Sequence, residues 1–186
     1  IFQDPFGCLN PSQSVGYMIT RGLQLQGISH KDARQRGIEL LEQVGLGEPA
    51  FKRKPRSFSG GQRQRIGIAR ALAMGPDVVI ADESVSALDL SVQKQVLRLM
   101  NDLQAKYRMA IIFITHDLRV AAQISDYITV MEKGMMVEFG PAEQVFETPK
   151  HAYTKRLLAA APGRDWHPPR LTAAEAAAIA ASIERV

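Results

Sequence analysis

Two short apolar runs constrain the fold of this chain more than any other feature. The first, residues 78–81, is followed by Asp82 and Glu83, and the second, residues 110–114, is followed by a threonine and His116. Neither run alternates polar and apolar residues, which is typical of parallel strands covered on both faces. Between them, apolar residues recur at the helical spacing of three and four: Leu88, Val92, Val96, Leu99 and Leu103. The pattern predicts a strand–helix–strand unit with polar side chains at the carboxyl ends of its strands, where open α/β sheets bind ligands.

The rest of the chain is predicted to form helices, loops and one hairpin. Ile38, Leu41 and Val44 share a helical face that Gly45 ends, and Lys133–Gly134 suits a tight turn between two strands. The expected helices lie within 12–50 and over 61–74, 120–124, 141–147, 151–161 and 172–185, and the hairpin strands cover 127–131 and 135–138.

Composition excludes several classes of protein. The chain has 186 residues, a net charge of +4 and one cysteine, Cys8, so it is long enough for one domain or most of one and has no internal disulfide. It has no aromatic-interleaved basic stripe, which argues against a nucleic-acid partner. Its longest apolar runs are too short to span a bilayer, so we expect any membrane association to go through another protein.

The carboxylates of Asp82 and Glu83 admit two interpretations. At the exit of a buried strand, two acids are costly unless they have partners or a task. In a nucleotide-hydrolysing site, Asp82 would hold Mg²⁺ and Glu83 would polarise the attacking water. The alternative is a pair of acids that caps the following helix, and the two residues alone do not decide between these interpretations.

A Ser–Gly–Gly sequence precedes the helix expected over 61–74. Glycines let a backbone approach a ligand closely, and the amides at a helix N-terminus bind anions. Ser59 would add a hydroxyl donor to Gly60 and Gly61. By themselves these three residues favour the simpler interpretation, which is a Gly–Gly turn with a serine cap.

Taken together, these motifs resemble those of the ATP-binding cassette (ABC) ATPases. Phe58–Gln62 is similar to the LSGGQ signature, 78–83 to a Walker B strand with its catalytic glutamate, Ser86–Asp89 to the D-loop, His116 to the H-loop and Gln3–Pro5 to the Q-loop. Each motif is weak alone. The five occur in the family's order and cover nearly residues 1–160, which makes a chance resemblance negligible.

The resemblance implies an α/β fold: a P-loop NTPase-like ABC cassette, with a mostly parallel central sheet, flanking helices and a helical subdomain. It divides the chain into a Q-loop and helical subdomain (1–60), a core with signature helix, Walker B, D-loop and H-loop (61–147), and a C-terminal extension (148–186).

The resemblance also implies ATP and Mg²⁺ as ligands. Asp82 and Gln3 would contact the metal, Glu83 would act on the attacking water with Gln3 nearby, and His116 would contact the γ-phosphate. In the family two cassettes pair head to tail around ATP, so the signature residues would serve the nucleotide of a second cassette: Ser59, Gly60, Gly61 and Gln62. Ser86 and Asp89 would cross the dimer interface, although Asp89 could simply cap the helix that follows it.

Two departures from the family pattern stand out. Ser84–Val85 replaces the usual Pro–Thr after the catalytic glutamate, which leaves the backbone there less pre-set. No Gly-x-x-x-x-Gly-Lys-Ser/Thr occurs in the 186 residues, so the loop and lysine that cradle the β- and γ-phosphates are missing. We therefore expect this chain to begin inside a cassette, after its phosphate-binding loop.

Two segments narrow the resemblance to the dipeptide, oligopeptide and nickel importers. Residues 3–11, QDPFGCLNP, resemble the QDPxxSLNP segment of these ATPases, and 148–158 resemble their HPYTxxLL element. The resemblance implies peptide import by an ATPase on the cytoplasmic face of the cell membrane. Its partners would be a second cassette, membrane permeases and, indirectly, an extracytoplasmic substrate-binding protein. The alternatives are a cassette for nickel or another solute, an exporter cassette, and a soluble ABC ATPase outside transport.

The missing phosphate loop leads to a first prediction. Phosphoryl transfer is catalysed mainly by positioning and electrostatic stabilisation, and that loop supplies much of both. We expect the 186 residues alone neither to bind ATP tightly nor to hydrolyse it, in an assay of phosphate release with Glu83→Gln as background control. A robust hydrolysis rate that disappears in the Glu83→Gln variant would contradict this.

Overall fold

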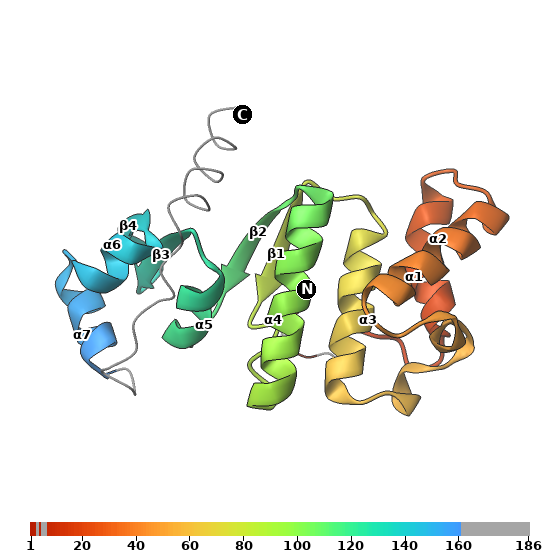
Figure 1. Cartoon of the computed structure of the whole chain (residues 1–186), viewed down its shortest axis with the longest axis horizontal. Helices are drawn as coiled ribbons and strands as arrows, with labels where there is room; N and C mark the ends of the chain where they lie inside the picture. The colour runs from red at the N-terminus through yellow and green to blue at the C-terminus, as the bar shows by residue number, and fades with distance from the viewer. Residues whose placement is uncertain (3, 5–6, 161–186) are drawn as a thin grey trace. The chain divides into compact units, whose positions relative to one another are not determined.

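The computed structural model describes residues 1–2, 4 and 7–160 (Figure 1). The described chain forms two compact units, one from Ile1 to His116 and one that begins at Asp117. The helix expected over 172–185 lies outside the described residues.

The first unit contains the predicted strand–helix–strand arrangement. Strands β1 (Val78–Asp82) and β2 (Ala110–Ile114) pair in parallel with no register shift, from Val78 opposite Ala110 to Asp82 opposite Ile114. Helix α4 (Leu90–Tyr107) connects them. A parallel pair needs such a crossover, because its two strands start at the same edge of the sheet. The prediction of two neighbouring strands is confirmed.

One face of this sheet is buried and the other is not. The buried face includes Val79 and Ala81, and α4 buries its own apolar stripe of Val96, Leu97, Met100 and Leu103. The opposite face carries four side chains that are about half exposed: Val78, Ile80, Ile112 and Ile114. The expectation of strands covered on both faces is therefore wrong for the described chain, although the apolar composition behind it suits a covered strand.

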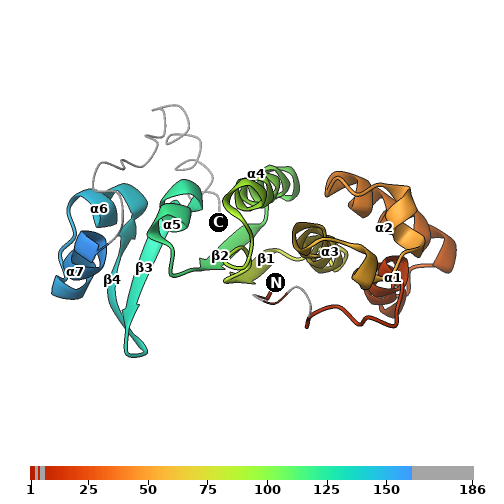
Figure 2. The same cartoon turned by 90° about the horizontal axis from the view of Figure 1, so that it is seen from below.

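Three further helices complete the first unit (Figure 2). They are α1 (Val15–Leu25), α2 (His30–Gln43) and α3 (Gly60–Leu72), with the short 3₁₀ turns η1 (Glu48–Lys52) and η2 (Pro55–Ser57) before α3. A serine caps the start of each helix: Ser14, Ser29 and Ser59. Gly45 follows α2 with a positive φ of 74°, as the sequence predicts, and Gly75 follows α3 in the same way with a φ of 61°. Ile19, Leu41 and Ile66 form the fully buried centre.

The second unit, as far as residue 160, is a hairpin with three helices. It consists of α5 (Leu118–Ile124), β3 (Tyr127–Glu132), β4 (Met135–Pro141), α6 (Ala142–Glu147) and α7 (Ala152–Ala160). Lys133 and Gly134 have φ angles of 51° and 80°, which are the two left-handed positions of a type I′ turn. The hairpin prediction is confirmed.

A buried carboxylate joins α7 to the hairpin. Glu138 on β4 is 9% exposed and accepts hydrogen bonds from the backbone N–H groups of Lys150 (2.7 Å) and His151 (3.1 Å). These amides belong to the two residues just before α7, at the end of the helix where a negative charge is favoured. The bond from Lys150, first of all, lowers the pKa of Glu138.

We predict that Glu138→Gln destabilises the second unit by about 1–3 kcal/mol at pH 7, because charged hydrogen bonds are lost in a buried place. A carboxyl with a lowered pKa contributes stability above its unfolded pKa of about 4.3, and loses it as pH falls through the folded pKa. Urea unfolding should show a difference between wild type and variant that is full above that pH and shrinks in acid. An equal difference at all pH values would contradict the role of the carboxylate.

Candidate functional site

The parallel register brings the predicted acidic and histidine side chains to one edge of the sheet. Asp82 ends β1 opposite Ile114, which ends β2, and the Glu83 N–H donates to the Ile114 carbonyl at 2.9 Å. His116 follows two residues later. Its Nδ1 lies 3.1 Å from Glu83 Oε1, and the Glu83 side chain is less exposed than the imidazole, 29% against 72%. This contact leaves the second ring nitrogen for another partner.

Glu83 adopts an unusual backbone conformation. Its φ of 44° lies in the left-handed region, which costs a non-glycine residue on the order of 1–2 kcal/mol. The Glu83 carbonyl closes a turn by accepting from the N–H (3.1 Å) and hydroxyl (2.9 Å) of Ser86. Strain of this kind gathers at functional sites and persists only where the surroundings over-determine it.

Burial holds this turn where the family has a proline. Ser84 and Val85 are each 2% exposed, and the Ser84 hydroxyl has no hydrogen-bond partner among the described residues. Two side chains anchored in the core restrict the loop from inside, in place of the fixed φ that a proline supplies. The loop at Ser84–Val85 is therefore held by packing despite the substitution.

The signature residues form a capped helix start. The Ser59 hydroxyl accepts from the Gln62 N–H (3.3 Å), and Gln62 Oε1 accepts from the Ser59 N–H (3.1 Å), which is a capping box. This use of Ser59 consumes only an acceptor site, so the hydroxyl proton can still be donated to an anion. Ser59 can therefore cap α3, as the simpler interpretation proposed, and still donate a hydrogen bond to an anion.

Gly61 has a packing role that the sequence did not indicate. A Cβ on Gly61 would lie 2.3 Å from Cγ1 of Val92 on α4, whereas one on Gly60 would meet Leu88 at an ordinary 3.7 Å. The absence of a side chain at Gly61 therefore lets α3 approach α4 closely. The same approach places the signature beside the D-loop.

Asp89 caps α4, as one of the two interpretations of the sequence proposed. Its carboxylate accepts from the N–H groups of Ser91 (3.1 Å) and Val92 (3.0 Å) and from the Ser91 hydroxyl (2.8 Å). The Val92 bond, the largest cause, lowers the pKa of Asp89. Ser86 and Asp89 are both exposed at the surface.

The two groups of site residues are not joined by hydrogen bonds within the part of the chain that the structure describes: none links the signature residues 59–62 to Asp82, Glu83 or His116. Gln3, predicted to contact the metal and the water, lies outside the described residues. Within them, no group of three or more His, Cys, Asp or Glu side chains is arranged to hold a metal. Two carboxylates suffice for Mg²⁺, which takes one or two from a protein and the rest from phosphates and water.

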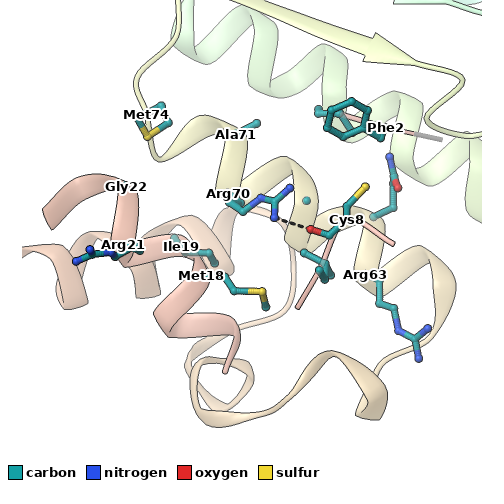
Figure 3. Close-up of a pocket in the computed structure, with 14 residues that line it drawn as sticks. Phe2, Cys8, Met18, Ile19, Arg21, Gly22, Arg63, Arg70, Ala71 and Met74 are labelled. Carbon is teal, nitrogen blue, oxygen red and sulfur yellow. Dashed lines mark hydrogen bonds between the residues drawn. The ribbon is translucent and has the colours of Figure 1, made fainter. Parts of the chain in front are cut away.

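A pocket of about 370 Å³ lies between α1, α3 and the N-terminal segment of the chain (Figure 3). Arg70 on α3 spans its wall and donates to the Cys8 carbonyl at 2.7 Å. Four α3 residues in its lining, Arg63, Gly67, Arg70 and Ala71, follow a helical period, and Met74 lines the pocket from the turn after the helix. The sequence pattern does not indicate this second face of α3, because arginines interrupt its apolar residues. Gln64 also lines the pocket, buried, with its Nε2 unpartnered among the described residues.

Comparison with known proteins identifies the class. A family model described as ABC transporter matches residues 1–86. The solved structure of CbiO1 from Clostridium perfringens, part of the ABC transporter complex CbiONQ, aligns with a TM-score of 0.72 and 29% identity, over 80% of this chain and 59% of that one. The chain belongs to the ABC transporter family of ATP-binding proteins, and its mixed α/β fold is that of the ABC cassette.

Two curated relatives are more similar still in sequence. The glutathione import ATP-binding protein GsiA of Salmonella typhimurium is 51% identical over 166 residues, which are 89% of this chain and 27% of GsiA. The oligopeptide transport ATP-binding protein OppF of Bacillus subtilis is 51% identical over 164 residues, which are 87% of this chain and 54% of OppF. The chain thus spans about a quarter and about half of their respective lengths. Among its described helices, none is both long and apolar enough to cross a bilayer.

The contact between Gly61 and Val92 gives a testable prediction. Gly61→Ala should destabilise the first unit by about 1–3 kcal/mol, the usual cost of overpacking, despite alanine's better helix propensity. Urea unfolding measures this cost. Combining Gly61→Ala with Val92→Ala should recover part of it, whereas Gly67→Ala on the same helix, with open space around the added methyl group, is the matched control. Equal stability of Gly61→Ala and wild type would refute the close packing.

Proposed function

We propose that the complete protein carrying this chain is the ATP-hydrolysing subunit of an ABC importer for small peptides. The observation that carries this proposal is the pairing of Glu83 with His116 beside Asp82, at the carboxyl edge of two parallel strands. Its two relatives named for glutathione and oligopeptide transport support the peptide class of cargo, since glutathione is itself a short peptide.

The proposed roles follow from the geometry and the donor chemistry. Glu83 accepts a hydrogen bond from the attacking water and polarises it, and its contact with His116 fixes the carboxylate. His116 then offers its remaining nitrogen to the γ-phosphate. Asp82, exposed at the end of β1, would help to hold the Mg²⁺ that accompanies ATP, and Gln3 would be a second ligand that also contacts the attacking water. The bound ion would neutralise charge developing on the phosphates.

The other residues of the proposed site serve a nucleotide that is held by a second cassette. The start of α3 presents the Ser59 hydroxyl and the amides of Gly60 and Gly61, with Gln62 completing the cap, to the triphosphate held by a partner cassette. Leu88 and Val92 lie beside this helix start, and we propose that the nearby residues Ser86 and Asp89 cross the same interface.

The finer fold and the partners belong to the same proposal. β1 has β2 at one edge and Ile1 at the other, where the Ile1 N–H donates to Ile80 (2.6 Å) and its carbonyl accepts from Asp82 (2.8 Å). Strands flanked on both sides and bare apolar faces fit a larger, mostly parallel sheet.

The pocket between α1 and α3 suits an apolar element of a permease. This contact would hold the protein at the cytoplasmic face of the membrane and, through the permease, couple it to a substrate-binding protein. The proposed domain limits remain 1–60, 61–147 and 148–186.

The decisive variant is Glu83→Gln in the complete transporter. The amide keeps the size and can still contact His116, but it is not a base. We expect ATP binding to persist, turnover to fall by at least about 10²-fold, and ATP to trap the closed cassette pair. Phosphate release and equilibrium binding of a fluorescent ATP analogue measure the two effects.

Glu42→Gln is the matched control. Glu42 is an exposed carboxylate on α2, it undergoes the same chemical change, and it has no part in the proposed site. It should retain wild-type turnover. Turnover in Glu83→Gln that stays within about two-fold of wild type would remove Glu83 from its role, since loss of a general base costs far more. Transport of labelled di- or tripeptides into vesicles tests the cargo separately.

A further inference from the structure

The side chain of Arg53 contacts the two residues that precede Ser59, the serine of the signature. It lies in the loop between η1 and η2, and its Nε donates to the Ser57 hydroxyl at 3.2 Å. A terminal nitrogen of the same guanidinium donates to the Ser57 carbonyl. The guanidinium carbon also stands 4.2 Å from the centre of the Phe58 ring, within the range of a cation–π contact. Three contacts therefore connect one side chain to Ser57 and Phe58.

The main chain of Arg53 is itself fixed. Its N–H donates to the Ala50 carbonyl at 3.1 Å, and its carbonyl accepts from the N–H of Val15, the first residue of α1, at 2.9 Å. The side chain thus extends from a backbone held at the start of α1. An anchored base lowers the entropic cost of holding a long side chain in one rotamer.

Phe58 passes this restraint on to the helix start. Its ring is 5% exposed, and the next residue is Ser59, the cap of α3. A planar guanidinium can stack on a ring and donate two directed hydrogen bonds at once, which a lysine ammonium cannot do. The pattern of contacts accordingly requires an arginine at 53, rather than a positive charge alone.

We propose that Arg53 is a positioning residue for the signature loop, one that presents the Ser59 hydroxyl and the α3 amides in the orientation that a partner cassette's triphosphate requires. The inference rests on the proposed function, because it assigns a task to the same signature residues. Arg53 acts through Ser57 and Phe58 and lowers the cost of ordering the loop when the cassettes close. It therefore affects closure and leaves nucleotide binding to the open cassette unchanged.

The test uses the complete transporter in lipid nanodiscs with the Glu83→Gln substitution, so that ATP closes the cassettes without turnover. Energy transfer between dyes on the two cassettes reports closure as a function of MgATP concentration. Arg53→Met should raise the concentration for half-maximal closure about ten-fold, the effect expected for losing one cation–π contact and two hydrogen bonds. Binding of a fluorescent ATP analogue to the open state should stay unchanged.

Three companion variants distinguish the contacts of Arg53 with Ser57 and Phe58 from the effect of its charge. Arg53→Lys keeps the charge but not the planar fork, so it should close nearly as poorly as Arg53→Met. Arg56→Met removes a charge from the same loop, where the described Arg56 side chain has no hydrogen bond or ion pair, and it should close normally. Phe58→Leu keeps an apolar side chain in the core while removing the ring, and it should shift closure about three-fold, the loss of the cation–π contact alone.

The outcomes distinguish this inference from the proposed function. Closure of Arg53→Met or Phe58→Leu at the wild-type ATP concentration, or an equal shift in Arg56→Met, overturns the role of Arg53 and leaves the proposed function intact. Failure of ATP to close the Glu83→Gln transporter itself overturns both. If Arg53→Met lowers the unfolding temperature strongly, Arg53→Lys and Phe58→Leu decide the question.

Discussion

The parallel pairing of β1 with β2 determines the geometry of the site. Because Asp82 stands opposite Ile114, the chain leaves both strands at the same edge of the sheet, and the Glu83 N–H meets the Ile114 carbonyl. His116 then comes within 3.1 Å of Glu83 although 33 positions separate them in sequence. A shift of one residue in this register would turn the side chains of one strand to the opposite face and separate the pair.

The close approach of α3 to α4 is the second constraint. Gly61 leaves room for Val92, so the start of the signature helix sits against the turn that leads into α4. The residue pattern that suggests anion binding is thereby also a packing requirement. Asp89 combines roles in the same way, since it caps α4 at the surface where the proposed interface lies. In this region one residue commonly serves both stability and the proposed binding.

Some features were predictable because their signals are local. The described helices, the cap at Ser59, the stop at Gly45 and the Lys133–Gly134 turn depend on residues a few positions apart, and these predictions agree with the structure. The two strands were identified from apolar composition, but composition does not say which face is covered. Half-exposed Ile80 and Ile112 show that burial depends on what packs against a strand, which no local pattern contains.

The sequence alone determined the order of the motifs, the strand–helix–strand unit and the residue types of the proposed site, because these follow from backbone preferences and spacing. Only the tertiary structure decided the contact between Glu83 and His116, the left-handed backbone at Glu83, the lack of space at Gly61 and the cation–π contact of Arg53 with Phe58. Most of these depend on surfaces from separate segments meeting at distances of a few ångströms, and such distances are set by packing rather than by neighbours in the chain.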